Sequence, residues 1–501
     1  MKGKYLLLIL IFLCSCSQKH QKHSIDNSII VSGRVLNRDP LNNSVIIAPN
    51  RIAVNRESIK ASLDENGFFK TSFKSYVPLD FFISYSTNFL VLAHPGDSLF
   101  VEFDGSAKNR PELLDDIKFS GDFASENQEA AEFQEMYYSN NIYQNIIKRE
   151  SLMEVYDPER FTSYMDSCRG EWDKLLGRYK ERYHPTEIVL NWAKRTLEAD
   201  YYQDLLYYMK VYSYRAEKKG LSAERIPAEY LNLIKHHFKV NKSVLINGFS
   251  MFGFVDFYKI YIMEIVKREN KQFFSSRDTV LKHQDVLDSL RFFSTISNTD
   301  DSLLRQMVLT EMLFQGLEFS KVEIFDRFKK EISEIITEPY LKEPLFEEYR
   351  NTLDKINIPV LASDIILKKL SSSILTASID SMIRSSKGKV IYLDCWATWC
   401  GPCLSELPKS LKLIEEYKGK KIAFIFVCID SEEKNWKSTL SRLQLKGEHI
   451  FLNKEESAEF RKLFNIKGIP RYMLFDKKGN IADDNALSPS YIKIKLDKLR
   501  N

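Results

Sequence analysis

Cysteine is scarce in this chain, which has seven cysteines among 501 residues. Small secreted domains that are held together by disulfides use many paired cysteines, so this class of protein is excluded. The length allows about two to four domains instead. A hydrophobic content of 44% and a charged content of 28% are typical of globular proteins with a buried core.

An excess of charge of one sign is also missing. The 72 basic and 68 acidic residues leave a net charge of +4, and no long basic run is present. We therefore expect no nucleic acid among the partners. Long hydrophobic runs are missing as well. The apolar run at residues 5–13 is too short for a membrane-spanning helix, which needs about 20 apolar residues.

The N-terminus has the pattern of a targeting segment. Lys2 and Lys4 precede the apolar run, and Cys16 follows it in the order Leu-x-Ser-Cys. This order resembles a bacterial lipoprotein signal, with residues 1–15 removed and lipid attached to the Cys16 thiol. The alternative is an ordinary secretory signal with incidental cysteines. Under the first interpretation, residues 16–27 are a polar tether, and the mature protein is lipid-anchored in the cell envelope and faces the periplasm.

Three regions follow the tether, and each has its own pattern. Short apolar segments separated by Gly, Pro and Asn-Gly turns predict a β-sandwich-like domain at residues 28–121. Glycine and proline become sparse in residues 122–356, where longer helical periods predict an all-α region. Strands alternate with helices in residues 357–501, which predicts an α/β domain.

Cys400 and Cys403 are separated by two residues in this last region. The pattern predicts a strand at residues 389–393 and a helix at residues 402–417, so Cys400 should lie at the start of the helix and Cys403 one turn later. Unpaired N–H groups at a helix start favour an anion, which lowers a thiol pKa. Zinc binding is the alternative for such a pair, but structural zinc takes four ligands, and the sequence offers no second pair. We expect no metal and no cofactor.

The residues around the pair carry a resemblance. The segment Trp399-Cys400-Gly401-Pro402-Cys403 follows Asp394 and precedes Pro408, and Ile469-Pro470 comes later. They resemble the thioredoxin superfamily, and within it the TlpA/ResA-like extracytoplasmic thiol–disulfide oxidoreductases. The resemblance covers about residues 370–501, or a quarter of the chain. It implies a thioredoxin-like fold for the C-terminal domain.

The resemblance also implies a role for each of three residues. Cys400 and Cys403 would form a redox-active disulfide, in which the Cys400 thiolate attacks a substrate disulfide and Cys403 resolves the mixed disulfide. Asp394 would be buried at the end of the strand, with a pKa raised by the loss of water. Its expected role is to accept the proton of Cys403.

Substrate binding is implied for three other residues. Trp399 lies beside the reactive pair, and the peptide bond between Ile469 and Pro470 is cis in the family. Such a bond would present the Ile469 backbone to an extended substrate chain. Arg471 departs from the family pattern, which has a small hydroxyl residue there, and this departure affects substrate preference.

The expected function is thiol–disulfide exchange. Gly-Pro between the cysteines resembles the reducing thioredoxin type, so we predict reduction of protein disulfides, with electrons supplied by a membrane partner. The alternative is a redox-sensing or scaffold lipoprotein, in which the strand-rich and helical regions carry the main role.

Overall fold

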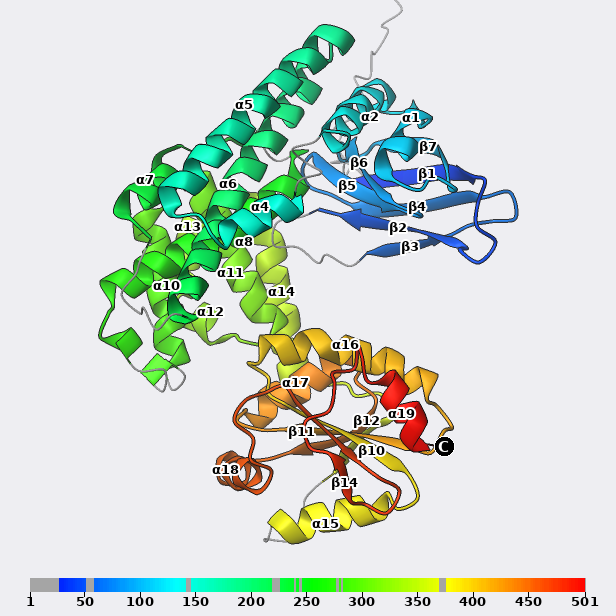
Figure 1. The fold of residues 1–501 in the computed structure, drawn as a ribbon, viewed down its shortest axis with the longest axis vertical. Helices are drawn as coiled ribbons and strands as arrows, with labels where there is room; N and C mark the ends of the chain where they lie inside the picture. The colour runs from blue at the N-terminus through cyan, green and yellow to red at the C-terminus, as the bar shows by residue number, and fades with distance from the viewer. Residues whose placement is uncertain are drawn as a thin grey trace, which may run out of the picture.

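The computed structural model describes residues 27–50, 58–140, 146–218, 226–237, 240–242, 246–275, 279–280, 283–368 and 375–500. The predicted signal segment, Cys16 and all but the last residue of the predicted tether lie outside this part of the chain. Within it, no helix has the length and apolar character that crossing a membrane requires. A strand-rich region, a helical region and a C-terminal α/β region follow one another, as expected (Figure 1). Their exact limits stay predictions.

The strand-rich region consists of two four-stranded sheets around one hydrophobic core. One sheet has the order β4-β1-β7-β8 and the other β3-β2-β5-β6. Side chains alternate between the core and the outside along β1, as the period of two residues requires. The bounds are β1 Ser28–Leu36, β2 Ser44–Pro49, β3 Ile59–Ser62, β4 Phe68–Lys74, β5 Leu79–Ser84, β6 Asn88–Ala93, β7 Ser98–Asp104, α1 Arg110–Asp115 and β8 Lys118–Gly121.

Helix α2 (Ala124–Tyr138) covers β6, the edge strand of the second sheet. The Asn127 side chain accepts a hydrogen bond from the Leu92 N–H (2.7 Å) and donates one to the Leu92 carbonyl (2.9 Å). Gln134 does the same with Leu90, at 2.8 and 2.9 Å. The two amides are seven residues apart, or about two helical turns, and therefore lie on one face of α2. They satisfy an edge strand that would otherwise expose unpaired backbone groups.

The central region is helical throughout its described residues. Helix α6 packs along α8, and α11 packs along α14. The hydrophobic core of this region includes Leu90 and Leu92 of β6, so it is continuous with the strand-rich region. The bounds are α4 Ile146–Met153, α5 Pro158–Tyr183, α6 Glu187–Lys218, α7 Ala228–His237, α8 Gly248–Glu269, η2 Phe273–Ser275, α10 Gln284–Asn298, α11 Ser302–Glu318, α12 Glu323–Arg327, α13 Lys329–Ile335 and α14 Pro339–Asn357.

A buried carboxylate joins the strand-rich region to the helices. Asp80 of β5 is fully buried and accepts hydrogen bonds from the Trp192 indole (3.2 Å), the Phe249 N–H (2.8 Å) and the Asn50 amide (3.2 Å). Helix α8 begins at Gly248, which lies against the backbone of Asn50. A Cβ atom at position 248 would collide with the Asn50 carbonyl oxygen. Burial raises the pKa of Asp80 to about 6, although the three hydrogen bonds oppose the shift.

The C-terminal region has a six-stranded sheet of order β14-β13-β10-β11-β12-β9. Strands β10, β11, β12 and β9 are parallel, whereas β13 pairs antiparallel with β10 and β14 pairs antiparallel with β13. The bounds are β9 Ile365–Lys368, α15 Leu375–Ser385, β10 Val390–Trp396, α16 Gly401–Glu416, β11 Ile422–Cys428, α17 Glu433–Leu443, β12 Gly447–Phe451, α18 Lys454–Leu463, β13 Arg471–Phe475, β14 Ile481–Asp483 and α19 Lys493–Arg500.

Each face of this sheet has its own core. Helices α16, α17 and α19 cover one face, and α15 and α18 cover the other. All seven residues of β10 are buried, as expected for a parallel strand between two helical layers. Alternate residues therefore enter different cores: Tyr392 and Trp396 face α16, whereas Leu393 and Cys395 face the opposite layer.

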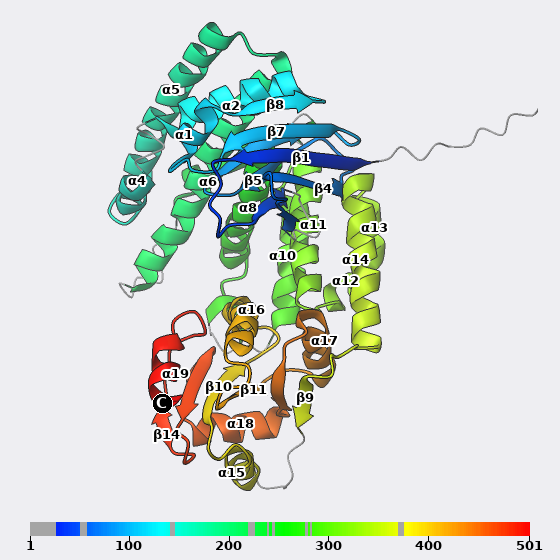
Figure 2. The same cartoon turned by 90° about the vertical axis from the view of Figure 1, so that its right-hand side faces the viewer.

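The C-terminal region contacts the helical region through α17, which packs against α14 (Figures 1 and 2). The contact is partly polar. The hydroxyls of Ser320 and Ser438 share a buried hydrogen bond of 2.8 Å. Lys434 and Glu323 form an exposed ion pair at 4.0 Å. Phe319, at the end of α11, packs against the core on the α16 face of the C-terminal sheet.

Candidate active site

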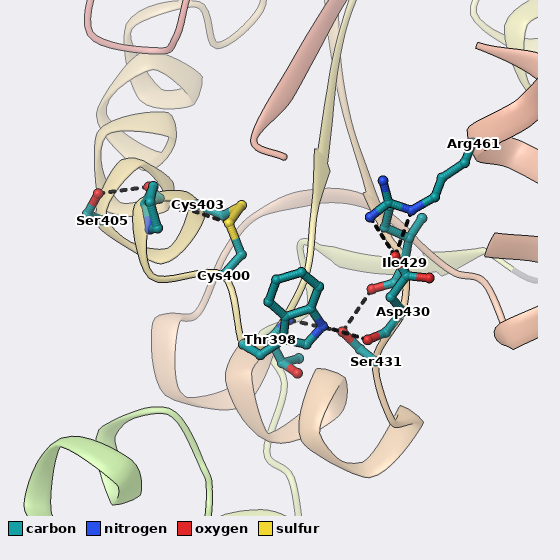
Figure 3. Close-up of a disulfide and its surroundings, with 10 residues drawn as sticks. Thr398, Cys400, Cys403, Ser405, Ile429, Asp430, Ser431 and Arg461 are labelled. Carbon is teal, nitrogen blue, oxygen red and sulfur yellow. Dashed lines mark hydrogen bonds and ion pairs between the residues drawn. A yellow bond between two sulfur atoms is a disulfide. The ribbon is translucent and has the colours of Figure 1, made fainter. Parts of the chain in front are cut away.

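Cys400 lies at the corner between β10 and α16. It is the N-cap residue of α16, and its Sγ accepts a hydrogen bond of 3.2 Å from the Cys403 N–H. The two residues form a disulfide with a Cα–Cα distance of 5.2 Å (Figure 3). Pro402 fits the first turn of the helix, where its missing N–H leaves no hydrogen bond unmade. The geometry places the Cys400 sulfur where helix N–H groups stabilise a thiolate.

The pair is buried, but its neighbour is exposed. Cys400 and Cys403 are 4% and 1% exposed, whereas Trp399 is 43% exposed. A large apolar side chain at the surface beside a reactive pair can contact a protein substrate. The cysteines that remain among the described residues, Cys168, Cys395 and Cys428, are free and buried.

Asp394 lies in β10 on the sheet face that α16 covers, because its side chain alternates with those of Cys395 and Leu393. It is 1% exposed, and among the described residues its Oδ1 atom has no hydrogen-bond partner. Burial raises its pKa well above the ordinary value, and the nearby Glu406 carboxylate adds to the shift. A buried carboxyl with an unmatched acceptor on the face of the reactive helix has the environment of a proton-transfer group.

Glu406 is the residue that the sequence analysis missed. It lies on α16 and receives hydrogen bonds from Lys409 (2.6 Å) and Ser490 (3.0 Å). Burial raises its pKa, but these hydrogen bonds outweigh the effect of burial, so the pKa is lowered overall and Glu406 stays charged. Its charge raises the pKa of Asp394 and of Tyr472, which pairs with Asp394 across the sheet. Its position three residues after Cys403, on the same helical face, was the available signal.

The predicted substrate-binding segment lies at the same end of the sheet. The peptide bond between Ile469 and Pro470 is cis, as the resemblance implied. Arg471 follows it and pairs with Cys395 of β10, which brings Pro470 next to the end of the strand that leads to Cys400. The Arg471 guanidinium is held by Asn485 (3.2 Å) and Asp484 (3.6 Å), in the loop after β14.

In the part of the chain that the structure describes, metal-binding side chains do not gather around the cysteine pair. Among the described residues, no group of three or more His, Cys, Asp and Glu side chains could hold a metal ion. Cys400 and Cys403 are joined by a disulfide in this structure, and thiol–disulfide exchange acts on such a bond.

Comparisons with known proteins agree with this arrangement. Residues 388–481 match a family model described as thioredoxin-like. The thioredoxin-like protein YneN of Bacillus subtilis is 32% identical over 124 residues, which are 24% of this chain and 67% of YneN. The thiol–disulfide oxidoreductase ResA of Bacillus cereus is 24% identical over 140 residues, which are 28% of this chain and 76% of ResA.

A solved structure shows a similar relation. The thioredoxin domain of a thiol–disulfide oxidoreductase from Bacteroides vulgatus is 25% identical to this chain in sequence. The matched part is 24% of this chain and 84% of that domain's chain, and the TM-score is 0.23. The similarity to all three proteins concerns about a quarter of the chain and does not describe the rest. The chain therefore belongs to the thioredoxin-like family, and it is a thiol–disulfide oxidoreductase related to ResA.

Proposed function

We propose that this protein reduces the disulfide bonds of other proteins outside the cytoplasm. The observation that carries the proposal is the Cys400–Cys403 disulfide at the start of α16, with the Cys403 N–H directed at the Cys400 sulfur. The exposed Trp399 gives a substrate chain a surface beside the pair. Gly-Pro between the cysteines supports the reducing direction, because the resemblance is to the reducing thioredoxin type.

The reaction proceeds in two exchanges. The Cys400 thiolate attacks one sulfur of the substrate disulfide, and that bond breaks as a mixed disulfide forms. The released substrate sulfur takes a proton from water. The Cys403 thiol then gives its proton to the Asp394 carboxylate, and its sulfur attacks the Cys400 sulfur. The second substrate sulfur leaves as a thiolate, so the substrate gains two electrons and the Cys400–Cys403 disulfide closes.

Glu406 tunes the base in this sequence. A carboxylate with an ordinary pKa is a poor base for a thiol, because the two pKa values are far apart. Burial and the charge of Glu406 raise the pKa of Asp394 and so bring it closer to that of the Cys403 thiol. The transfer of the proton then costs less free energy.

The return of electrons and the location complete the proposal. The closed disulfide needs two electrons and two protons, which we assign to a membrane partner with a dithiol. Cys16, outside the described residues, would carry the lipid anchor. A Cys16→Ser variant should then lose incorporated fatty acid and move from the membrane fraction to the soluble fraction. A Cys14→Ser variant is the matched control, and unchanged fractionation of Cys16→Ser would refute the anchor.

Disulfide reduction is tested by insulin turnover with dithiothreitol as the electron source. Cys400→Ser should abolish turnover, whereas Cys168→Ser, which changes a buried free cysteine elsewhere, should retain it. Cys403→Ser should accumulate mixed disulfides with defined proteins. A variant that traps nothing would favour the redox-sensing or scaffold alternative. A reduction potential near −270 mV, roughly that of thioredoxin, supports the reducing direction, and a value near −120 mV, roughly that of DsbA, contradicts it.

A further inference from the structure

The exposed Trp399 is fixed by the loop that follows β11. Its indole Nε1–H donates a hydrogen bond of 2.7 Å to the carbonyl oxygen of Asp430. The neighbouring backbones are joined as well, because the Ile429 N–H donates to the Trp396 carbonyl (2.9 Å) and the Thr398 N–H donates to the Ser431 hydroxyl (3.0 Å). The segment with Trp399 is thereby attached to this loop. Figure 3 shows its neighbour Thr398 beside Ser431.

Asp430 holds an unusual backbone conformation. Its φ is +49°, in the left-handed region, which few residues other than glycine adopt and in which asparagine and aspartate are the commonest exceptions. This conformation orients the carbonyl toward Trp399, and such conformations persist only where the surroundings determine them. The Asp430 N–H donates to the Ser457 hydroxyl (3.0 Å). This bond holds the backbone of Asp430 but not its carboxylate.

Arg461, in the last turn of α18, holds that side chain. Its Nε and Nη2 atoms lie 2.8 and 2.6 Å from Oδ2 of Asp430, and its Nη1 donates to the Ile466 carbonyl (3.2 Å). The two charged side chains are 27% and 34% exposed, so water screens the pair only in part. Figure 3 shows the guanidinium reaching Asp430 from the side away from the disulfide.

We propose that Arg461 is a positioning residue for substrate binding. It fixes the Asp430 carboxylate and the left-handed turn, and the Asp430 carbonyl in turn holds the Trp399 indole beside Cys400. The indole then offers a preformed apolar surface to the polypeptide around the substrate disulfide. This inference rests on the proposed reduction of protein disulfides and names the residue, remote from the sulfurs, that prepares the protein-binding surface.

Loss of the contact between Arg461 and Asp430 should weaken the binding of a protein substrate. An indole that is free to rotate must be ordered when substrate binds, so Arg461→Ala should raise the KM for insulin by about fivefold. The effect on kcat should be smaller, and so should the effect on the rate constant with the small substrate 5,5′-dithiobis(2-nitrobenzoate), which needs less of the indole surface. Lys462→Ala, an exposed neighbour on α18, is the matched control.

Three further measurements separate an effect on positioning from an effect on folding. Asp430→Asn keeps a residue that tolerates the left-handed region but removes the negative charge, and it should raise KM as Arg461→Ala does. Arg461→Lys keeps a positive charge and should recover part of the lost affinity. The emission of Trp399, taken as the difference between each variant and the same variant with Trp399→Phe, should report a more mobile indole in Arg461→Ala and Asp430→Asn.

The outcomes decide the inference separately from the proposed function. An unchanged KM for insulin in both Arg461→Ala and Asp430→Asn would overturn it, and so would equal losses with insulin and the small disulfide. If Arg461→Ala does not fold, Asp430→Asn decides alone. A wild-type protein without insulin turnover would instead refute the proposed function, whatever the variants do.

Discussion

Among the residues that the structure describes, two aspartates are almost completely buried, and they differ in what surrounds them. Asp80 joins the strand-rich and helical regions and accepts three hydrogen bonds. Asp394 lies on the face of β10 that α16 covers, and among the described residues its Oδ1 atom has no partner. Burial raises the pKa of both. Burial alone therefore does not distinguish a structural carboxyl from a reactive one.

The hydrogen bonds make the difference. Donors from three segments of the chain offset the cost of burying Asp80, so this group stabilises the junction. The cost of burying Asp394 is not offset in this way, and the charge of Glu406 increases it. An apolar residue would be more stable at this position, so the proton-transfer role proposed for Asp394 would account for a carboxyl there.

The largest predicted effect is on the structural aspartate. Asp80→Ala removes the acceptor of the buried Trp192 indole and of the Phe249 N–H, so it should destabilise the joined strand-rich and helical regions by about 4 kcal/mol. Denaturant unfolding followed by tryptophan emission measures this. The exposed Asp116→Ala should change the unfolding midpoint little. A loss as small for Asp80→Ala as for Asp116→Ala would remove the distinction between the two aspartates.

The reactive aspartate should matter for rate. Asp394→Asn cannot accept the Cys403 proton, so resolution of the mixed disulfide should slow by about a hundredfold. Rapid acid quenching and mass spectrometry of the mixed disulfide measure this step. The exposed Asp380→Asn in the same region is the control. Unaltered resolution in Asp394→Asn would show that water, not Asp394, takes the proton.

The pH dependence of stability tests the same residue, and here Asp394→Asn should be favourable, because the substitution that slows the reaction should stabilise the folded protein. The pKa of Asp394 is raised in the folded protein from 3.8, so the folded state binds the proton more tightly than the unfolded state. Its favourable contribution is present below pH 3.8 and is lost as the pH rises through the folded pKa. Asp394→Asn should thus be more stable than wild type at neutral pH, with a gap that closes toward low pH. Thermal unfolding of both proteins across the pH range measures this difference in stability. A difference that is absent or reversed at neutral pH would contradict the raised pKa of Asp394.

The smallest effect concerns the attachment of the C-terminal region. Ser438→Ala leaves the buried Ser320 hydroxyl without its partner and should cost about 1 kcal/mol, with insulin turnover retained. Ser441→Ala, which removes a more exposed hydrogen bond to the Val360 carbonyl, is the matched comparison and should cost less. Hydrogen exchange in α17 measures both. A cost for Ser438→Ala as large as that for Asp80→Ala would show that the two junctions are equally strong.

Local signals predicted the corner between β10 and α16. A strand, a two-residue spacing and a helix start place Cys400 at the start of the helix and Cys403 one turn later, as the structure has them, and the strand period places Asp394 on the sheet face that α16 covers. The catalytic roles of these residues stay predictions. The short edge strands β9 and β14 were not predicted, because three or four residues carry no clear periodicity. Glu406 was missed although it lies one turn from Cys403, because an acidic residue on a helix is usually a solvated one.

The sequence by itself determined the family, the cysteine pair and the succession of a strand-rich, a helical and an α/β region, because these depend on residue spacing and periodicity along the chain. Only the tertiary structure showed that Asp80 is a structural carboxyl, that Asn127 and Gln134 pair with an edge strand, and that Arg461 reaches Asp430. The physical reason is range: these contacts join residues 30 to 169 positions apart, and no local pattern records which distant donor meets a buried acceptor.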